Sequence, residues 1–219
     1  MPNNNTVCLF VTSYQGDAHF ISEFLHSCVT QTEAPDEFIV FCSGANPEVV
    51  DSIVLEESGK TVPVRLVSVK DTCTAGTARN MALEFSSSDI ISFCDVDDFM
   101  HPQRMEAVRH VFDNNDVDLF VHNYVKGYRG KQTLTPPKKI DDLNSDLYEI
   151  LEHDKNSTNL IAKYAIAHGP CSVKRDVLKA IKYQNWNYAE DGDFCQRVLK
   201  SGYKVLGTSH KLLYYCRKI

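Results

Sequence analysis

Short apolar runs separated by helix-like stretches dominate the first half of the chain. The expected strands are 7–11, 37–42, a segment within 62–69, and 89–94, and the expected helices are 17–30, 47–58 and 76–85. Asp17 is expected to cap the first helix and Pro47 to open the second. Because strand and helix alternate, we predict βαβ units with right-handed crossovers and a parallel sheet.

The second half follows the same pattern with one interruption. We expect a helix at 102–112, a strand at 117–122, helices at 173–181 and 190–200, and strands at 203–207 and 212–216. Residues 124–139 contain five Lys or Arg residues and no acid, which predicts either a solvated loop or a lid over a site. Residues 141–163 are predicted to be helical. With no internal repeat and no long linker, residues 1–219 are expected to form one α/β domain.

Composition excludes several classes of protein. Hydrophobic residues make up 43% and charged residues 24%, as in ordinary globular domains, and a net charge of −6 gives no basis for nucleic-acid binding. We expect neither a signal peptide nor a transmembrane segment, and therefore a cytoplasmic location. The eight cysteines form no Cys-x-x-Cys pair, which favours buried reduced thiols over a zinc site or a disulfide framework.

An acidic stretch follows the fourth expected strand. Asp95, Asp97 and Asp98 lie at its carboxyl end, where open α/β sheets bind ligands. If the chain stays extended, Asp95 and Asp97 point the same way, and a divalent cation such as Mg²⁺ or Mn²⁺ would relieve their repulsion. The alternative is a solvated acidic turn before the helix that follows Pro102. The spacing alone leaves both interpretations open.

Four stretches occur in an order that is typical of one enzyme family. They are Val11-Thr12-Ser13-Tyr14, the helix opening at 76–83, Asp95-Val96-Asp97-Asp98, and the segment 188–199 with its Glu190-Asp191 pair. The set resembles the GT-A fold of nucleotide-sugar-dependent glycosyltransferases, especially family two. This resemblance implies a Rossmann-like GT-A domain with a central, mostly parallel sheet flanked by helices. Residues 1 to about 98 would form the nucleotide half, and residues 99–219 the acceptor half.

The resemblance assigns nucleotide contacts to the first strands. Thr12, Ser13 and Tyr14 would hold the nucleobase, with Tyr14 stacking on a uracil. Arg79, on a glycine-containing helix start, would contact the diphosphate or the base. The family usually ends its second strand with an acid that binds uracil; this chain has Ser43 there, which would take the place of the acid in binding the base.

The same resemblance implies a metal site beside the donor sugar. Asp95 would face the ribose or the metal, and Asp97 would bind the Mn²⁺ or Mg²⁺ that bridges the donor phosphates. The ion would neutralise the leaving diphosphate. Val96 and Asp98 would contact the donor sugar. His210 is where some GT-A enzymes place a third metal ligand, although a lone histidine is more often structural.

The last motif carries the expected catalytic groups. By resemblance, Asp191 is the general base that deprotonates the acceptor hydroxyl, with Glu190 as the second candidate. His168 and Gly169 would contact donor or acceptor. The implied reaction moves a sugar from a nucleotide sugar, expected to be a UDP-sugar, to a glycan or other hydroxyl acceptor. Inversion at the anomeric carbon is expected, and the sequence leaves retention open.

Two other functions remain compatible with the acidic motif. Phosphohydrolases of the haloacid dehalogenase type also place Asp-x-Asp after a strand, but on an early strand rather than at Asp95. A sugar-nucleotide-binding module without turnover would share the donor and metal sites and would not need Asp191 as a base.

Overall fold

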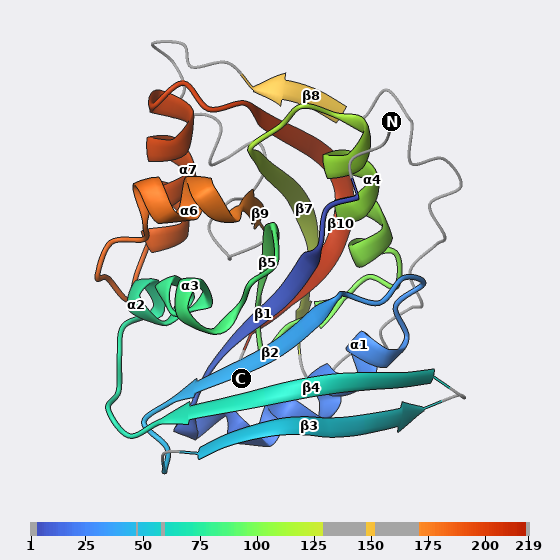
Figure 1. Ribbon diagram of the computed structural model, residues 1–219, viewed down its shortest axis with the longest axis vertical. Coiled ribbons are helices and arrows are strands. Elements are labelled where there is room, and N and C mark those ends of the chain that lie inside the picture. Colours follow the sequence, from blue (N-terminus) through green and yellow to red (C-terminus); the bar gives the residue numbers. More distant parts are fainter. Residues whose placement is uncertain (1–3, 47, 58–59, 129–147, 152–170, 218–219) are drawn as a thin grey trace.

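One ten-stranded mixed sheet runs through the middle of the computed structural model, with helices on both faces (Figure 1). The structure describes residues 4–46, 48–57, 60–128, 148–151 and 171–217. In spatial order the strands are β3 (Glu48–Glu57), β4 (Lys60–Val69), β2 (Glu37–Ser43), β1 (Val7–Tyr14), β5 (Ile90–Asp95), β9 (Cys171–Lys174), β7 (Leu119–Tyr128), β10 (Val205–Arg217) and β6 (Phe99–Met100), with β8 (Tyr148–Leu151) pairing with β10.

The strands that carry the predicted motifs run in parallel. β4, β2, β1 and β5 are parallel neighbours, and β10 pairs in parallel with β7. β9 is antiparallel to both β5 and β7, so β7 and β10 share the direction of the first four strands. The register pairs Thr12 with Asp95 at the carboxyl edge. The predicted α/β class with a mostly parallel sheet is confirmed.

Helices cover both faces because the strands are apolar on both. In β1, Val7, Leu9 and Val11 pack on one face, and Cys8 and Phe10 pack on the other. The first face is covered by α1 (Ile21–Val29) and α4 (Arg104–Asn114). The second is covered by α2 (Ala75–Asn80), α3 (Ala82–Phe85), α6 (Arg175–Ile181) and α7 (Glu190–Lys200). No helix in the described ranges is long and apolar enough to cross a membrane.

The helix predicted for 47–58 is wrong. Residues 48–57 form β3, an edge strand antiparallel to β4. The segment is rich in Val and Ile, which favour strands over helices. Its register shifts between Val50 and Ile53, and this irregularity breaks the period-two pattern by which a strand is recognised.

The helix boundaries needed three further corrections. Residues 15–20 form a 3₁₀ helix, η1 (Gln15–Phe20), and α1 starts after it with no side-chain cap, so Asp17 does not cap α1. The helix predicted at 76–85 is divided at Met81 into α2 and α3. The helix predicted from Val173 begins at Arg175, because β9 occupies the preceding residues.

The second half contains more strand than predicted. β7 continues to Tyr128, so residues 124–128 are not loop, and residues 148–151 form β8 instead of helix. The two predicted final strands are one strand, β10, interrupted by register shifts between Thr208 and Leu213. Tertiary pairing along β10 decides all three cases. The rest of the predicted loop and helix, 129–147 and 152–163, lies outside the described residues.

The predicted thiol state agrees with the structure. Every cysteine whose side chain is described is free, and most of these thiols are buried. Burial raises the pKa of Cys8 to about 12, so this thiol stays protonated and unreactive at neutral pH.

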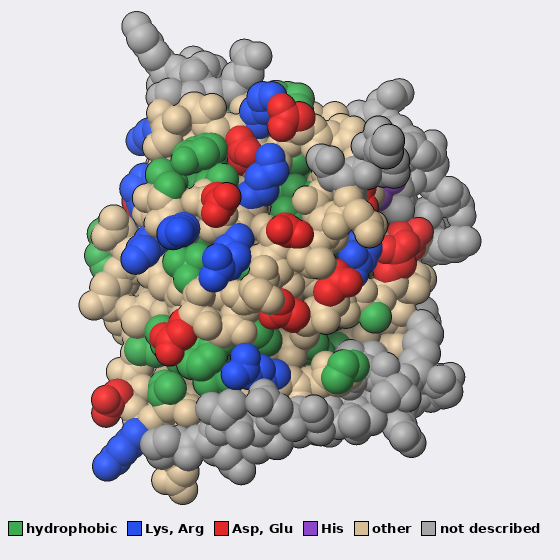
Figure 2. Space-filling view, in the orientation of Figure 1, with side chains coloured by type: hydrophobic (Ala, Val, Ile, Leu, Met, Phe, Trp, Pro, Cys, Tyr) green, Lys and Arg blue, Asp and Glu red, His purple; other side chains and the backbone are tan. Residues whose placement is uncertain are grey.

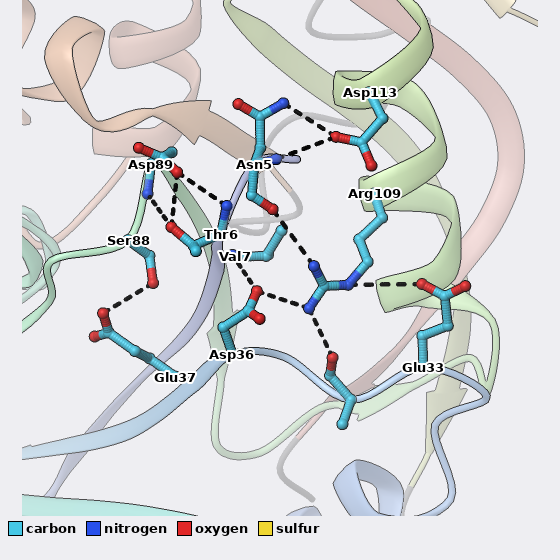
Figure 3. Close-up of polar contacts among 11 residues, drawn as sticks. Asn5, Thr6, Val7, Glu33, Asp36, Glu37, Ser88, Asp89, Arg109 and Asp113 are labelled. Carbon is cyan, nitrogen blue, oxygen red and sulfur yellow. Dashed lines mark hydrogen bonds and ion pairs between the residues drawn. The ribbon is translucent and has the colours of Figure 1, made fainter. Parts of the chain in front are cut away.

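A polar network joins the amino ends of the strands to α4 (Figure 3). Asp89 accepts hydrogen bonds from the Thr6 backbone N–H at 2.9 Å and from its hydroxyl at 2.7 Å. Asp36 accepts from Val7 N–H and from the Arg109 guanidinium, both at 2.7 Å. These contacts hold the start of β1 against β5 and α4, on the opposite edge from the carboxyl ends of the strands.

Glu37 at the start of β2 belongs to the same edge. Its carboxylate accepts from Ser87 N–H at 3.0 Å and from the Ser87 and Ser88 hydroxyls, both at 2.9 Å. Burial by itself would raise the pKa of Glu37, but these hydrogen bonds outweigh it and lower the pKa below its ordinary value.

We predict that Glu37→Gln costs about 1 kcal/mol of unfolding free energy at pH 7, because an amide replaces one acceptor oxygen with a donor. The folded-state pKa is depressed, so this contribution is present above the unfolded pKa and disappears as pH falls through the folded pKa. Urea unfolding should show a higher unfolding free energy for the wild type than for Glu37→Gln at pH 7, and no difference at about pH 3. Glu84→Gln, at an exposed position of α3, is the control. A difference that persists unchanged at low pH would contradict this account.

Candidate active site

A cavity of about 350 Å³ opens at the carboxyl edge of the parallel strands. Its walls come from the ends of β1, β2 and β5, the segment after β4, and the starts of α2 and α7. The lining residues are Thr12, Ser13, Tyr14, Asp17, Ser43, Thr72, Cys73, Ala75, Ala78, Arg79, Asp95, Val96, Asp97, Asn187 and Glu190. Residues from all four motifs recognised in the sequence therefore line this one cavity.

Arg79 is the central side chain of the cavity wall. It is 3% exposed, and its Nη2 donates to Asp95 Oδ1 at 3.0 Å and to Oδ2 at 3.3 Å. Its Nη1 donates to Glu190 Oε1. The Thr12 hydroxyl donates to Asp95 Oδ1 at 2.8 Å. One guanidinium thus joins the end of β5 to the start of α7, which are 95 residues apart in sequence.

Electrostatics keep Arg79 charged despite its burial. Loss of solvent by itself lowers the pKa of the guanidinium, but Asp95 first, then Tyr183, Glu190 and Asp191, raise it above its ordinary value overall. The guanidinium carbon also lies 5.7 Å from the centre of the Tyr183 ring. The cavity wall therefore carries a permanent positive charge balanced by carboxylates.

The acidic stretch forms a turn rather than an extended chain. β5 ends at Asp95, and Asp98 N–H donates to Asp95 C=O at 3.1 Å, closing the turn. Asp95 and Asp97 both line the cavity, as predicted, but the turn and not strand alternation brings them to the same side. Val96 also lines the cavity, whereas Asp98 is buried and does not.

The Glu190-Asp191 pair begins α7 after a left-handed residue. Ala189 has φ of 59°, which turns the chain into the helix. Glu190 lines the cavity and is bound to Arg79. Asp191 is 4% exposed and is not among the lining residues, and its Oδ1 accepts from Gly192 N–H at 2.7 Å. The two carboxylates therefore have different environments, with Glu190 ion-paired and Asp191 set behind the wall.

Of the predicted histidine and glycine site residues, the structure describes only His210, which lies outside the cavity lining. His210 lies in the irregular part of β10, with its ring 5.9 Å from that of Tyr148, and it is not among the cavity residues. Burial lowers the pKa of His210. His168 and Gly169 lie outside the described residues.

A divalent cation fits the aspartates of the cavity. In the part of the chain that the structure describes, no three His, Cys, Asp or Glu side chains gather as a ready metal site. Mg²⁺-type ions, however, commonly use one or two carboxylates and take their other ligands from water and substrate phosphates. Asp97 lines the cavity, and Asp95, whose side chain is 30% exposed, has carboxylate lone pairs beyond those used by Thr12 and Arg79. These two residues match that donor set.

Several cavity residues were not identified from the sequence. They are Asp17, Thr72, Cys73, Ala75, Ala78 and Asn187. Thr72 and Cys73 follow the carboxyl end of β4, a position at which a strand-end rule would have found them. Asp17 was interpreted as a helix cap. It is 7% exposed, and its charge adds to the burial that raises the pKa of the neighbouring Cys42 thiol.

Comparison with known proteins agrees with this geometry. The family model described as "Glycosyl transferase family 2" matches residues 8–182. The chain belongs to glycosyl transferase family 2. No curated protein matches it. The family model ends before Glu190 and Asp191, so their assignment depends on the structure and on the motif.

Solved structures share the fold of this family 2 chain at low sequence identity. S. aureus TarS 1–349 in complex with UDP-GlcNAc has a TM-score of 0.68 and 16% identity, covering 98% of this chain and 59% of that one. The mannosyltransferase PcManGT from Pyrobaculum calidifontis, in complex with GDP-Man and Mn²⁺, has a TM-score of 0.63 and 16% identity, with the same coverage. This chain thus spans about three fifths of either neighbour, and the GT-A fold is shared.

We predict that Arg79→Met lowers the unfolding free energy by about 3 kcal/mol, because it leaves Glu190 and Asp95 without their cation. Arg79→Lys should recover part of this loss, since one ammonium cannot donate to both carboxylates in the fork geometry of arginine. Urea unfolding measures both. Arg109→Met, which removes the more exposed contacts with Asp36 and Glu33, should cost less than about 1 kcal/mol. Equal losses for the Arg79→Met and Arg109→Met variants would contradict the central role of Arg79.

Proposed function

We propose that this family 2 chain transfers a sugar from a nucleotide-sugar donor to a hydroxyl acceptor. The observation that carries the proposal is the single cavity in which Asp95, Asp97, Arg79 and Glu190 converge. Thirteen of its fifteen lining residues lie before residue 98, which supports residues 1 to about 98 as the nucleotide half and 99–219 as the acceptor half. The free cysteines support a reducing, cytoplasmic setting.

A UDP-sugar is the proposed donor. Tyr14 is 48% exposed on the cavity wall and offers a face for base stacking. The cavity wall carries the hydroxyls of Ser13, Ser43 and Thr72. The second strand ends without an acid, but Asp17 brings a carboxylate to the same cavity. A carboxylate accepts the ring N–H of uracil or guanine and disfavours cytosine and adenine, whose corresponding ring nitrogen is an acceptor. The two structural neighbours were solved with a uracil and a guanine donor.

Asp97 and Asp95 are proposed to hold Mn²⁺ or Mg²⁺ against the donor diphosphate. When bound, the ion supplies positive charge that stabilises the leaving diphosphate. Arg79 keeps the Asp95 carboxylate in place, while Thr12 fixes one of its oxygens. Val96, which lines the cavity, is proposed to contact the donor sugar, and Asp98, which is buried and outside the lining, is the weaker candidate for that contact. His210, away from the cavity lining, is the weaker candidate for a third ligand.

Asp191 is the proposed general base. The Glu190 carboxylate is engaged by the Arg79 guanidinium, so we assign proton transfer to Asp191, its neighbour at the start of α7. In the proposed step the acceptor oxygen attacks the anomeric carbon, the bond from that carbon to the diphosphate oxygen breaks, and Asp191 takes the hydroxyl proton. This single displacement inverts the anomeric centre. His168 and Gly169, in the acceptor half, are proposed to contact donor or acceptor.

Membership of glycosyl transferase family 2 gives no support to the phosphohydrolase alternative. A non-catalytic sugar-nucleotide-binding module would use the same cavity without the base. The two functions differ in turnover and not in donor binding, so they are separated by the Asp191 experiment below.

We predict that UDP or a UDP-sugar with Mn²⁺, at about 100 times its Kd, raises the melting midpoint by about 5–10 °C. Asp97→Ala should abolish the Mn²⁺-dependent part of this shift, because the ion loses a ligand from the cavity wall. Thermal melting with UDP, GDP, CDP and ADP, with and without Mn²⁺, measures both effects. Asp113→Ala is the control, because Asp113 lies in the polar network at the amino edge of the sheet and does not line the cavity. Metal-dependent affinity retained in Asp97→Ala would refute the metal assignment.

We predict that Asp191→Asn keeps the nucleotide-induced melting shift and lowers the transfer rate by about 10²–10⁴-fold, the usual contribution of a general base. Glu190→Gln should instead weaken donor binding, because it breaks the ion pair with Arg79. Release of UDP from the donor in the presence of acceptor measures transfer. Unchanged turnover in Asp191→Asn would show that another group is the base, and donor binding without any turnover in the wild type would favour the binding module.

A further inference from the structure

Exposed aromatic rings lie beside the mouth of the cavity. Among the described residues, the large hydrophobic side chains that are exposed are Tyr14, Ile150, Trp186 and Tyr188, with Tyr188 89% and Trp186 49% accessible. Asn187, which lies between Trp186 and Tyr188, lines the cavity. Three of these four exposed side chains therefore belong to the cavity wall or to the segment that borders it.

The segment that carries these rings is held firmly against α2. Asn185 Oδ1 accepts from the Thr74 and Thr77 hydroxyls at 2.6 and 2.9 Å. Asn187 Oδ1 accepts from Ala75 N–H at 3.1 Å. These bonds tie the inward-facing amides of the segment to the first turn of the helix that carries Arg79.

The backbone of the same segment is equally close to α2. Gly76 N–H donates to Trp186 C=O at 3.1 Å. A Cβ at Gly76 would lie 1.9 Å from Gln184 C=O, so only glycine permits this approach. The rings of Trp186 and Tyr188 are thus presented on a backbone that is fixed from the inside.

Both ends of the segment are anchored as well. Tyr183 is buried, with its ring stacked 4.1 Å from that of Phe194 and edge-on at 5.4 Å to Phe93. Glu190, at the other end, is bound to Arg79. Because the fold secures the segment without burying Trp186 or Tyr188, the exposure of these two rings is not a consequence of loose packing.

The chemistry of the segment favours a neutral, hydroxyl-rich ligand. Residues 183–189, Tyr-Gln-Asn-Trp-Asn-Tyr-Ala, contain no charged side chain in a protein where 24% of residues are charged. Aromatic faces bind the C–H faces of pyranose rings, and their polar edges tolerate the water around sugar hydroxyls. Rings held in place in advance lose little conformational entropy on binding.

We propose that Trp186 and Tyr188 form a stacking platform for the sugar rings of the acceptor, which makes a neutral oligosaccharide the acceptor class. This inference rests on the proposed function, because it places the acceptor next to the donor cavity and immediately before Glu190 and Asp191. The platform binds sugar units next to the one that receives the transfer, so a longer glycan binds more tightly than a monosaccharide.

Trp186 is the single tryptophan of the chain, so its fluorescence reports on this platform directly. The full chain is titrated with glucose, maltohexaose, cellohexaose, xylohexaose and chitohexaose. We expect a saturable change of tryptophan emission with at least one hexasaccharide and a much weaker response to glucose. Tyr188→Ala should weaken that affinity about tenfold, about 1.4 kcal/mol. Ile150→Ala, an exposed apolar residue on β8, should leave the affinity unchanged.

Trp186→Phe and Trp186→Ala complete the test by calorimetry, since Phe retains a stacking face and Ala does not. Absence of an emission change with all four hexasaccharides, or equal affinity of Tyr188→Ala and the wild type, would overturn the proposal. Concentration-dependent emission together with dimers in sedimentation would indicate a protein contact and would also overturn it. All variants should keep the melting shift with UDP and Mn²⁺. If the wild type shows no melting shift with UDP and Mn²⁺, the proposed function is wrong. The oligosaccharide titration tests the stacking platform independently of that result.

Discussion

The ion-pair bridge centred on Arg79 is the interaction on which the site depends. A guanidinium that is nearly inaccessible to solvent costs free energy unless carboxylates surround it, and Asp95 and Glu190 supply that compensation from two distant parts of the chain. The bridge orients Asp95 at the end of β5 and fixes the start of α7.

The bridge is possible because the parallel strands end at one edge. β1 and β5 are direct neighbours, so Thr12 and Asp95 lie side by side, and α2 and α7 cover the same face of the sheet. The amino edge is closed by a separate polar network around Asp89, Asp36 and Glu37 (Figure 3). Acidic and basic side chains are interspersed over the face shown in Figure 2. This network and the cavity thus occupy opposite edges of the sheet.

The loop before Glu190 joins the cavity wall to an exposed aromatic surface. Its amides cap the start of α2, its backbone packs against Gly76, and its aromatic rings remain exposed. Two exposed rings on a firmly held backbone are the observation behind the proposed sugar-binding surface, which lies just before the Glu190-Asp191 pair.

The sequence by itself determined which residues lie at the carboxyl ends of the parallel strands, because an apolar run followed by polar residues is a local signal. It predicted these positions for Thr12, Asp95 and Asp97, and the family resemblance added Arg79. The cavity contains all four residues. Tertiary structure decided the rest. β3 and β8 are strands because neighbours pair with them, and Asp17 is a cavity residue because η1 brings its charge close to Cys42 at the end of β2. Likewise, Glu190 and Asp191 are adjacent and chemically alike in the sequence. Only the packing of α7 against Arg79 gives them different surroundings, with Glu190 ion-paired in the cavity wall and Asp191 outside the lining. Such long-range contacts leave no local pattern in the sequence.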